Sequence, residues 1–222
     1  MNEQEIRNAH DILTAPLEVT GPATRDLVFV DDDGLLVGIW ECMPGVYDEP
    51  TTDYDEMMFM VSGRVTVVHP EGSLDIAPGT LWTTPRQWPG VWHVHQTVRK
   101  LYVIDPRSGG PGELRHLSNA HLLDLGDATP RPVVIAGDPH ERSVDIAAPN
   151  RLQVGVWECT PGEFPFARDG YDEVFCVLSG RADLHFDDGR SFELVAGTVI
   201  LTPAGSTGRW VVHETIRKAY TI

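Results

Sequence analysis

The sequence holds 222 residues, of which 41% are hydrophobic, and its 33 acidic against 17 basic side chains give a formal net charge of −16. This length suffices for two small domains with a core each, and no apolar run approaches the roughly 20 residues of a membrane-spanning helix. The acidic excess repels phosphate backbones and anionic lipids, so we expect no nucleic-acid partner and no membrane partner.

The N-terminal residues Met1–Asp11 are charged and lack the apolar stretch of a secretory signal, which predicts a cytoplasmic protein. Short helices are expected only over Glu3–Leu13 and Gly112–Leu125. The cysteines are odd in number, which argues against a disulfide framework and for buried core thiols in a reducing compartment. They are Cys42, Cys159 and Cys176.

Further along the chain, short β-rich segments alternate with turn signals made of Gly, Asp and Pro. Met57–Val61 and Arg64–His69 are separated by Ser62-Gly63, which predicts a turn between two strands. Val98–Ile104 is a third such segment. Many short strands at even spacing favour an all-β barrel or jelly roll.

The second half of the chain repeats the first. Val37–Gly45 (VGIWECMPG) returns as Val154–Gly162 (VGVWECTPG), and Trp92–Ile104 (WHVHQTVRKLYVI) returns as Trp210–Ile222 (WVVHETIRKAYTI). Between the copies, Asp105–Leu117 is rich in Gly and Pro, as is typical of a connection between compact units. We therefore predict an N-terminal barrel over residues 1–105, a linker over 106–118 and a C-terminal barrel over 119–222.

In each copy a Glu precedes a Gly by six residues, and later a Gly precedes a Pro by five. These positions are Glu56, Gly63, Gly79 and Pro85 in the first copy, and Glu173, Gly180, Gly197 and Pro203 in the second. The spacing resembles the cupin superfamily, which implies two tandem cupin barrels of the RmlC-like jelly-roll fold. The shared W-E-C-x-P-G and W-x-V-H-x-T-x-R-K-x-Y stretches look like the DUF861-like subfamily that includes ureidoglycine aminohydrolase and ethanolamine-utilisation cupins.

The usual metal ligands of that superfamily are missing. The resemblance implies an H-x-H shortly before the Glu and a third His after the Pro, but residues 49–52 and 166–169 contain no His, and the third position falls on Gly90 and Gly208. One Glu per barrel does not make a transition-metal site. We expect no metal and no cofactor, with a divalent metal on recruited donors as the alternative.

The resemblance also places the Glu of each copy inside its barrel, where a carboxylate needs a cation. Lys100 and Lys218 in the closing strands are the expected partners, with Trp92 and Trp210 as aromatic walls. The candidate ligand-binding residues are Tyr171, Glu173, Trp210, Glu214 and Lys218, with the equivalents Tyr54, Glu56, Trp92, Gln96 and Lys100. Glu173 and Lys218 are also the candidate catalytic pair, and a purely structural ion pair is the alternative.

Residues around the predicted barrel mouths differ between the copies. Residues 203–208 of the second copy include Gly205, Ser206 and Gly208, whereas the first copy has the large Trp88 in the matching stretch. We expect the second barrel to hold the wider pocket.

Three functions remain open at this stage. The loss of His ligands favours a metal-free bicupin that binds a small polar metabolite, as a sensor, carrier or accessory protein. The retained Glu173 and Lys218 favour an aminohydrolase-like or isomerase-like enzyme working by acid–base chemistry, with or without a divalent metal. Exposed strand edges would also permit a homodimer. The identity of the ligand cannot be read from the sequence.

Overall fold

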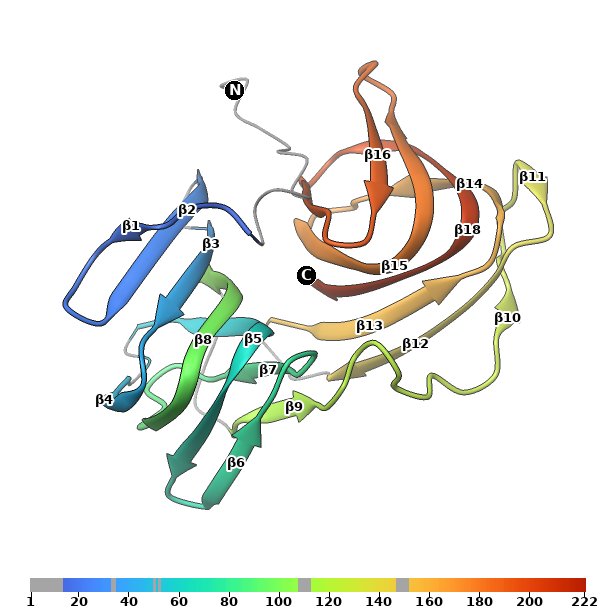
Figure 1. Ribbon diagram of the computed structural model, residues 1–222. Helices are drawn as coiled ribbons and strands as arrows, with labels where there is room; N and C mark the ends of the chain where they lie inside the picture. Colours follow the sequence, from blue (N-terminus) through green and yellow to red (C-terminus); the bar gives the residue numbers. More distant parts are fainter. Residues whose placement is uncertain (1–13, 33–34, 50, 52, 108–112, 147–151) are drawn as a thin grey trace. The chain divides into compact units, whose positions relative to one another are not determined.

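The computed structural model of the chain describes residues 14–32, 35–49, 51, 53–107, 113–146 and 152–222. These ranges form strands and turns and contain no helix, so the all-β prediction is confirmed. Contacts divide the chain into a unit that contains residues 15–120 and a unit that contains residues 121–145 and 155–222. We refer to them as the first and the second barrel (Figure 1).

Nine antiparallel strands make up the sheet of the first barrel. They are β1 (Glu18–Val19), β2 (Thr24–Asp32), β3 (Leu35–Cys42), β4 (Gly45–Asp48), β5 (Asp55–His69), β6 (Gly72–Ile76), β7 (Leu81–Thr84), β8 (Val91–Asp105) and β9 (Arg115–Leu117). The main order is β1-β2-β3-β8-β5-β7-β9, while β4 pairs with β8 and β6 pairs with β5. The two longest strands, β5 and β8, therefore lie at the centre of the sheet.

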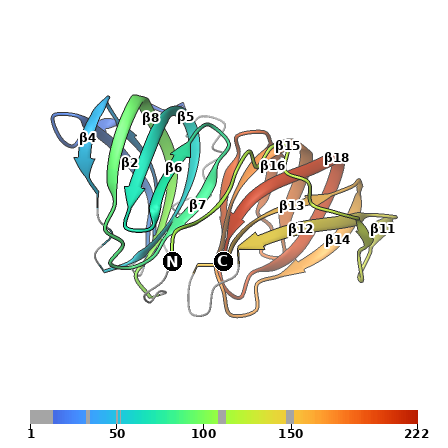
Figure 2. The ribbon, with the colours of Figure 1, turned by 90° about the horizontal axis from the view of Figure 1, so that it is seen from below.

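The second barrel repeats this arrangement. Its strands are β10 (Thr129–Pro130), β11 (Ala136–Gly137), β12 (His140–Ile146), β13 (Val154–Cys159), β14 (Gly162–Ala167), β15 (Glu173–Phe186), β16 (Ser191–Val195), β17 (Val199–Thr202) and β18 (Thr207–Thr221). The strand β15 pairs with β16, β17 and β18, as β5 pairs with β6, β7 and β8. Figure 2 shows the long strands of both barrels as curved ribbons. Equivalent strands come from the two copies of the sequence repeat.

The expected turn at Ser62-Gly63 is instead a bulge inside one continuous strand. β5 runs from Asp55 through to His69, and its register against β8 shifts between Met60 and Ser62 and again between Ser62 and Arg64. Gly63 has a φ of +92°. A bulge lets a long strand bend without ending, which is how one strand contributes to both halves of a barrel.

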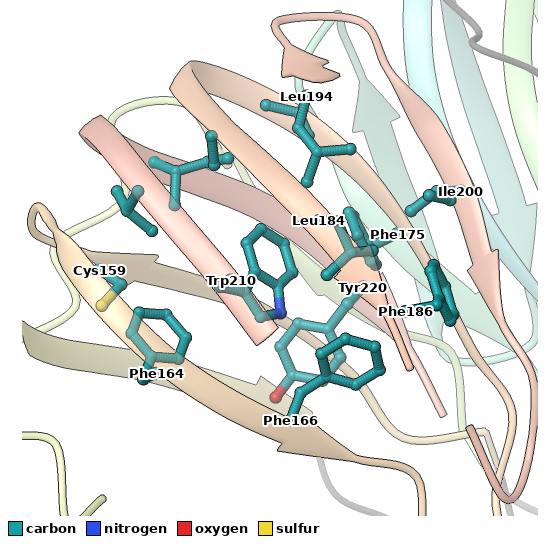
Figure 3. Close-up of a cluster of buried hydrophobic side chains, with 14 residues drawn as sticks. Cys159, Phe164, Phe166, Phe175, Leu184, Phe186, Leu194, Ile200, Trp210 and Tyr220 are labelled. Carbon is teal, nitrogen blue, oxygen red and sulfur yellow. The ribbon is translucent and has the colours of Figure 1, made fainter. Parts of the chain in front are cut away.

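Each barrel has its own apolar core, and the second core is dominated by aromatic rings. Figure 3 shows Phe164, Phe175, Trp210 and Tyr220 pointing into the second barrel. The Phe164 ring stacks on Trp210 with centroids 6.4 Å apart, and the Phe175 ring lies 5.5 Å from the same indole. These large rings fill space that smaller side chains would leave open.

The segment between the two copies contributes to the first sheet, because β9 lies within residues 106–118 and pairs with β7. The expected helix over Gly112–Leu125 is wrong for the part that the structure describes, since an edge strand and turns occupy it. The other expected helix, Glu3–Leu13, lies outside the described residues. Within the described ranges there is no helix long and apolar enough to cross a membrane.

Candidate functional site

Each barrel holds a buried carboxylate–ammonium pair on its two longest strands. Alternate side chains of a strand share a face, so Glu56 and Met60 of β5 point to the same side, and Lys100 of β8 lies opposite Met60. Lys100 Nζ donates to Glu56 Oε1 at 2.6 Å, and the two side chains are 8% and 10% exposed. Lys218 of β18 donates to Glu173 of β15 at 2.5 Å in the same way. The partners expected from the sequence meet in both barrels.

In the first barrel this pair lines a cavity of about 400 Å³. Small-molecule sites are typically of this size and combine apolar walls with a few polar groups. The lining residues are Asp26, Val28, Leu36, Trp40, Glu49, Thr51, Tyr54, Glu56, Met58, Thr84, Trp88, Trp92, Lys100, Tyr102 and Ile104. The walls are therefore mainly aromatic and aliphatic, with charge concentrated on four side chains.

Two further carboxylates line this first cavity, Asp26 from β2 and Glu49 from the end of β4. Asp26 accepts hydrogen bonds from Tyr102 Oη at 3.1 Å and from the Leu27 amide at 2.8 Å. Burial raises the pKa of Asp26 and the pKa of Glu49 above their ordinary values, because desolvation disfavours the charged form. The positive charge of Lys100 opposes this rise at both groups.

Three donors at the first cavity find no hydrogen-bond partner among the described residues. They are the indole N–H groups of Trp88 and Trp92 and the hydroxyl of Thr84, all fully buried atoms. A buried donor left without an acceptor costs free energy. Because these three atoms have almost no accessible surface, they are covered by protein and do not face the open space of the cavity.

The cavity of the second barrel is smaller, at about 170 Å³. Arg168 stands where the repeat has Thr51 in the first copy, and Phe166 stands where it has Glu49. Arg168 Nε donates to Thr202 Oγ1 at 2.8 Å, and its Nη2 donates to the Glu173 carboxylate. The residues that line this cavity are Arg131, Trp157, Phe164, Phe166, Arg168, Glu173, Trp210, Lys218 and Tyr220.

Positive charge dominates the walls of the second cavity, where Arg131, Arg168 and Lys218 face the single carboxylate of Glu173. Arg131 also donates to Glu141, which lies next to the cavity wall. Burial lowers the pKa of Lys218 to about 8, an effect that Arg168 reinforces and that the nearby Glu173 opposes. The ammonium of Lys218 therefore loses its proton at a lower pH than an exposed lysine does.

The prediction that the second barrel holds the wider pocket is wrong. The small residues at positions 203–208 do not widen the cavity: Arg168 is one of its lining residues, and its backbone pairs with this stretch, the Arg168 amide donating to Ser206 O at 2.9 Å and the Gly205 amide donating to Arg168 O at 2.7 Å. In the first barrel Trp88 forms a wall instead of a plug. Its indole folds over Gly90, where an added Cβ would lie 1.6 Å from the ring.

Not all predicted ligand-binding residues reach a cavity. Tyr54 and Trp92 line the first cavity and Trp210 lines the second, whereas Tyr171 is 37% exposed and lies outside the lining of the second cavity. The side chains of Gln96 and Glu214 are exposed and do not enter the barrels. Glu214 is paired there with Arg181 at 3.6 Å. The bulges in β5 and β15 reset the alternation of faces along the paired strands, which sequence reasoning did not foresee.

Sequence reasoning missed several cavity residues. Glu49 and Arg168 were considered only as positions that lack His. Their place beside a motif that faces the barrel interior could have indicated that they line the cavity. Asp26 lies next to Arg25, which matches Arg142 of the other copy, but Ser143 stands where the repeat has Asp26. Arg131 lies outside the matched motifs, so no shared motif indicated either residue.

The residues at the expected metal position do not fit a transition metal. The one carboxylate in each barrel that the resemblance would make a ligand already accepts a Lys ammonium, and in the second barrel Arg168 as well. A metal cation would have to displace these cations, and although Asp26 and Glu49 line the first cavity with Glu56, neither His nor Cys is among the lining residues of either cavity. Across the part of the chain that the structure describes, no group of three or more His, Cys, Asp or Glu side chains converges.

Comparisons with known proteins agree with this architecture. A family model for the EutQ-like cupin domain matches the chain twice, at residues 31–102 and 147–220. No curated protein matches the sequence.

Similar solved structures include a DUF861-family protein of unknown function from Pseudomonas syringae (TM-score 0.72, 23% identity, covering 89% of this chain and 85% of that one). A putative glyoxylate-induced protein from Pseudomonas aeruginosa has a TM-score of 0.65 at 16% identity, covering 92% and 82%. A mutant oxalate decarboxylase from Bacillus subtilis has a TM-score of 0.58 at 15% identity, covering 97% and 76%. At these identities the likeness shows the fold alone.

Proposed function

The chain belongs to the EutQ-like cupin domain family, and from this premise we propose that it is a metal-free bicupin whose first barrel binds a small polar metabolite. One observation carries the proposal: a cavity of about 400 Å³ surrounds the buried Lys100–Glu56 pair. A sensor, carrier or accessory protein needs such a site and no further chemistry.

The polar groups of the first cavity support binding over a purely structural role. The Glu173–Lys218 pair lines a smaller cavity, and there Arg168 also donates to the carboxylate. In the first barrel Asp26 and Glu49 line the wider cavity together with the Lys100–Glu56 pair. Buried polar groups are normally paired, so a ligand that pairs them is favoured.

The proposal is tested by a thermal-shift screen of small metabolites on the full chain and on the double variant Glu49→Phe/Met58→Phe. This variant gives the first barrel the phenylalanines that the second carries at positions 166 and 175. A ligand present at about 100 times its Kd stabilises the folded state by about 2.7 kcal/mol. We expect a shift of several degrees in the wild type and none in the variant.

Val46→Phe is the matched control, because Val46 is 65% exposed on β4 and the change adds an apolar ring outside the cavity. It should leave the shift intact. A ligand that stabilises the double variant as strongly as the wild type, or a broad screen without any hit, would contradict binding in the first barrel.

A second candidate function is favoured by the lowered pKa of Lys218. A buried amine that titrates at about 8, in contact with a carboxylate, has the properties of a general acid–base catalyst. This supports the aminohydrolase-like or isomerase-like alternative in the second barrel, with Glu173 as the partner. Turnover that disappears in Lys218→Met but survives Glu49→Phe/Met58→Phe would favour this alternative over binding in the first barrel.

A further inference from the structure

We propose that the cavity of the first barrel is a site for a small organic cation, an ammonium compound. This inference rests on the proposed function, since it names the chemical class of ligand that the same cavity takes. It follows from the charge and the aromatic rings of the cavity wall.

The first observation is an excess of negative charge around the cavity. Its lining contains three carboxylates, Asp26, Glu49 and Glu56, and one cation, Lys100. Lys100 is bound by Glu56 at 2.6 Å. Asp26 is held by neutral donors, the Tyr102 hydroxyl and a backbone amide. A positive ligand would compensate the two remaining carboxylates, which burial otherwise makes costly to ionise.

The second observation is that the same wall is aromatic. The ammonium of Lys100 already lies 4.9 Å from the ring centroids of both Trp40 and Trp92 and 5.9 Å from that of Tyr102. Tyr54 and Trp88 add two more rings to the lining. Aromatic faces attract ammonium groups, quaternary ones included, because the ring quadrupole is negative there. The wall is therefore suited to hold a second cation.

The second barrel supplies the contrast. Its cavity is lined by Arg131, Arg168 and Lys218 and by a single carboxylate, Glu173. This excess of positive charge repels a positive ligand. Glu49 of the first copy is replaced there by Phe166. The preference for a cation therefore belongs to the first barrel alone.

The test uses two probes that differ only in charge. Choline carries a quaternary ammonium and a hydroxyl, and 3,3-dimethylbutan-1-ol is its neutral isostere with carbon in place of nitrogen. Isothermal titration calorimetry of the full chain at low ionic strength should show choline binding at least about tenfold more tightly than the alcohol. Butyrate, an anion of similar size, should not bind the first barrel.

Glu49→Gln removes one charge at constant shape and should weaken choline binding about three- to tenfold. Glu71→Gln, an exposed position in the same barrel, should leave it unchanged. Equal affinity for choline and the alcohol would overturn the cation inference, as would an unaffected Glu49→Gln variant. The cation inference would also be overturned, but the proposed function kept, if an anionic or neutral ligand bound the wild type and its binding was lost in Glu49→Phe/Met58→Phe. A cavity that binds no probe and no metabolite would overturn both.

Discussion

At the scale of single residues, the same Glu–Lys pair acquires different properties from its neighbours in the two barrels. In the first barrel Lys100 lies among three carboxylates, while in the second Lys218 shares its only carboxylate with Arg168. A second cation on Glu173 weakens the compensation of the buried ammonium. Both copies keep the Glu–Lys pair, but the charge around the pair depends on Glu49 in the first barrel and on Arg168 in the second.

The lowered pKa of Lys218 predicts a rise of stability with pH. The pKa is about 8 in the folded chain against an ordinary value of 10.5. Between these values the unfolded state binds more protons than the folded state, so the free energy of unfolding should increase with pH, and below about 8 this dependence should vanish. From pH 8 to pH 9.5 the contribution of Lys218 is about 2 kcal/mol.

Urea unfolding of the wild type and of Lys218→Met at both pH values measures this contribution. Methionine keeps the length of the side chain without the amine, and Glu173 keeps its bond to Arg168. Other titrating groups, among them Tyr220 with its raised pKa, contribute equally to both proteins. The same pH dependence in both proteins would show that Lys218 keeps its ordinary pKa.

The sequence was a good guide to residues inside the repeated motifs and a poor one outside them. Glu56, Lys100 and Trp92 were predicted because resemblance assigns them to the interior, and the cavity contains all three. Asp26 reaches the cavity from β2, which shares only one identical residue with the other copy, Arg25 matching Arg142, and Asp26 itself is replaced there by Ser143. A side chain delivered by long-range strand pairing leaves no local pattern to read.

At the scale of elements, the glycine of the motif is needed for the bulge that bends the longest strand. A Cβ on Gly63 would lie 2.2 Å from the Thr97 carbonyl oxygen, and one on Gly180 would lie 2.1 Å from the Thr215 carbonyl oxygen. Both residues also have positive φ, at +92° and +88°. Tight turns and β-bulges both favour Gly, because Gly adopts a positive φ without steric cost. A bulge was therefore predicted as a turn.

Gly63→Ala should therefore destabilise the first barrel by about 2–4 kcal/mol, the sum of backbone strain and the clash with Thr97. Gly72→Ala is the control, since its φ is +149° but nothing lies within 4 Å of an added Cβ. Only strain of about 1 kcal/mol is expected there. Denaturation followed by tryptophan fluorescence gives both values, and equal losses would show that the close approach to β8 is unimportant.

Periodicity predicted the strands well and the segment around β9 badly. Met57–Val61, Arg64–His69 and Val98–Ile104 were predicted as strands and lie within β5 and β8, although β5 continues through the expected turn and β8 begins earlier. The stretch of residues 113–117 contains two leucines three positions apart, a spacing that also suits a helix, and its pairing with β7 decides the outcome. Tertiary pairing overrides so weak a local signal.

At the scale of the whole molecule, the two copies share a strand arrangement but differ in the residues that line their cavities. Strands β2–β8 correspond to β12–β18, yet one cavity is wide and lined by acids, and the other is narrow and lined by bases. The size difference follows from Glu49 and Met58 against Phe166 and Phe175, so a few side chains on a fixed sheet suffice. Two barrels can thus serve different purposes within a single chain.

Both interiors share one property, which gives the last prediction: the intact chain should bind no transition metal. Each barrel directs a Lys ammonium at the one cavity-lining carboxylate that both copies share, and the place expected for a third ligand is Gly90 or Gly208. Elemental analysis of protein purified without tag or chelator should find less than about 0.1 equivalents of manganese, iron, zinc or nickel. Glu56→Gln and Glu173→Gln provide the check, because a metal held in either barrel would lose its carboxylate ligand. One equivalent in the wild type that falls in one of these variants would place a metal where the described side chains provide for none, and the lysine would then have to swing away from its glutamate to admit it.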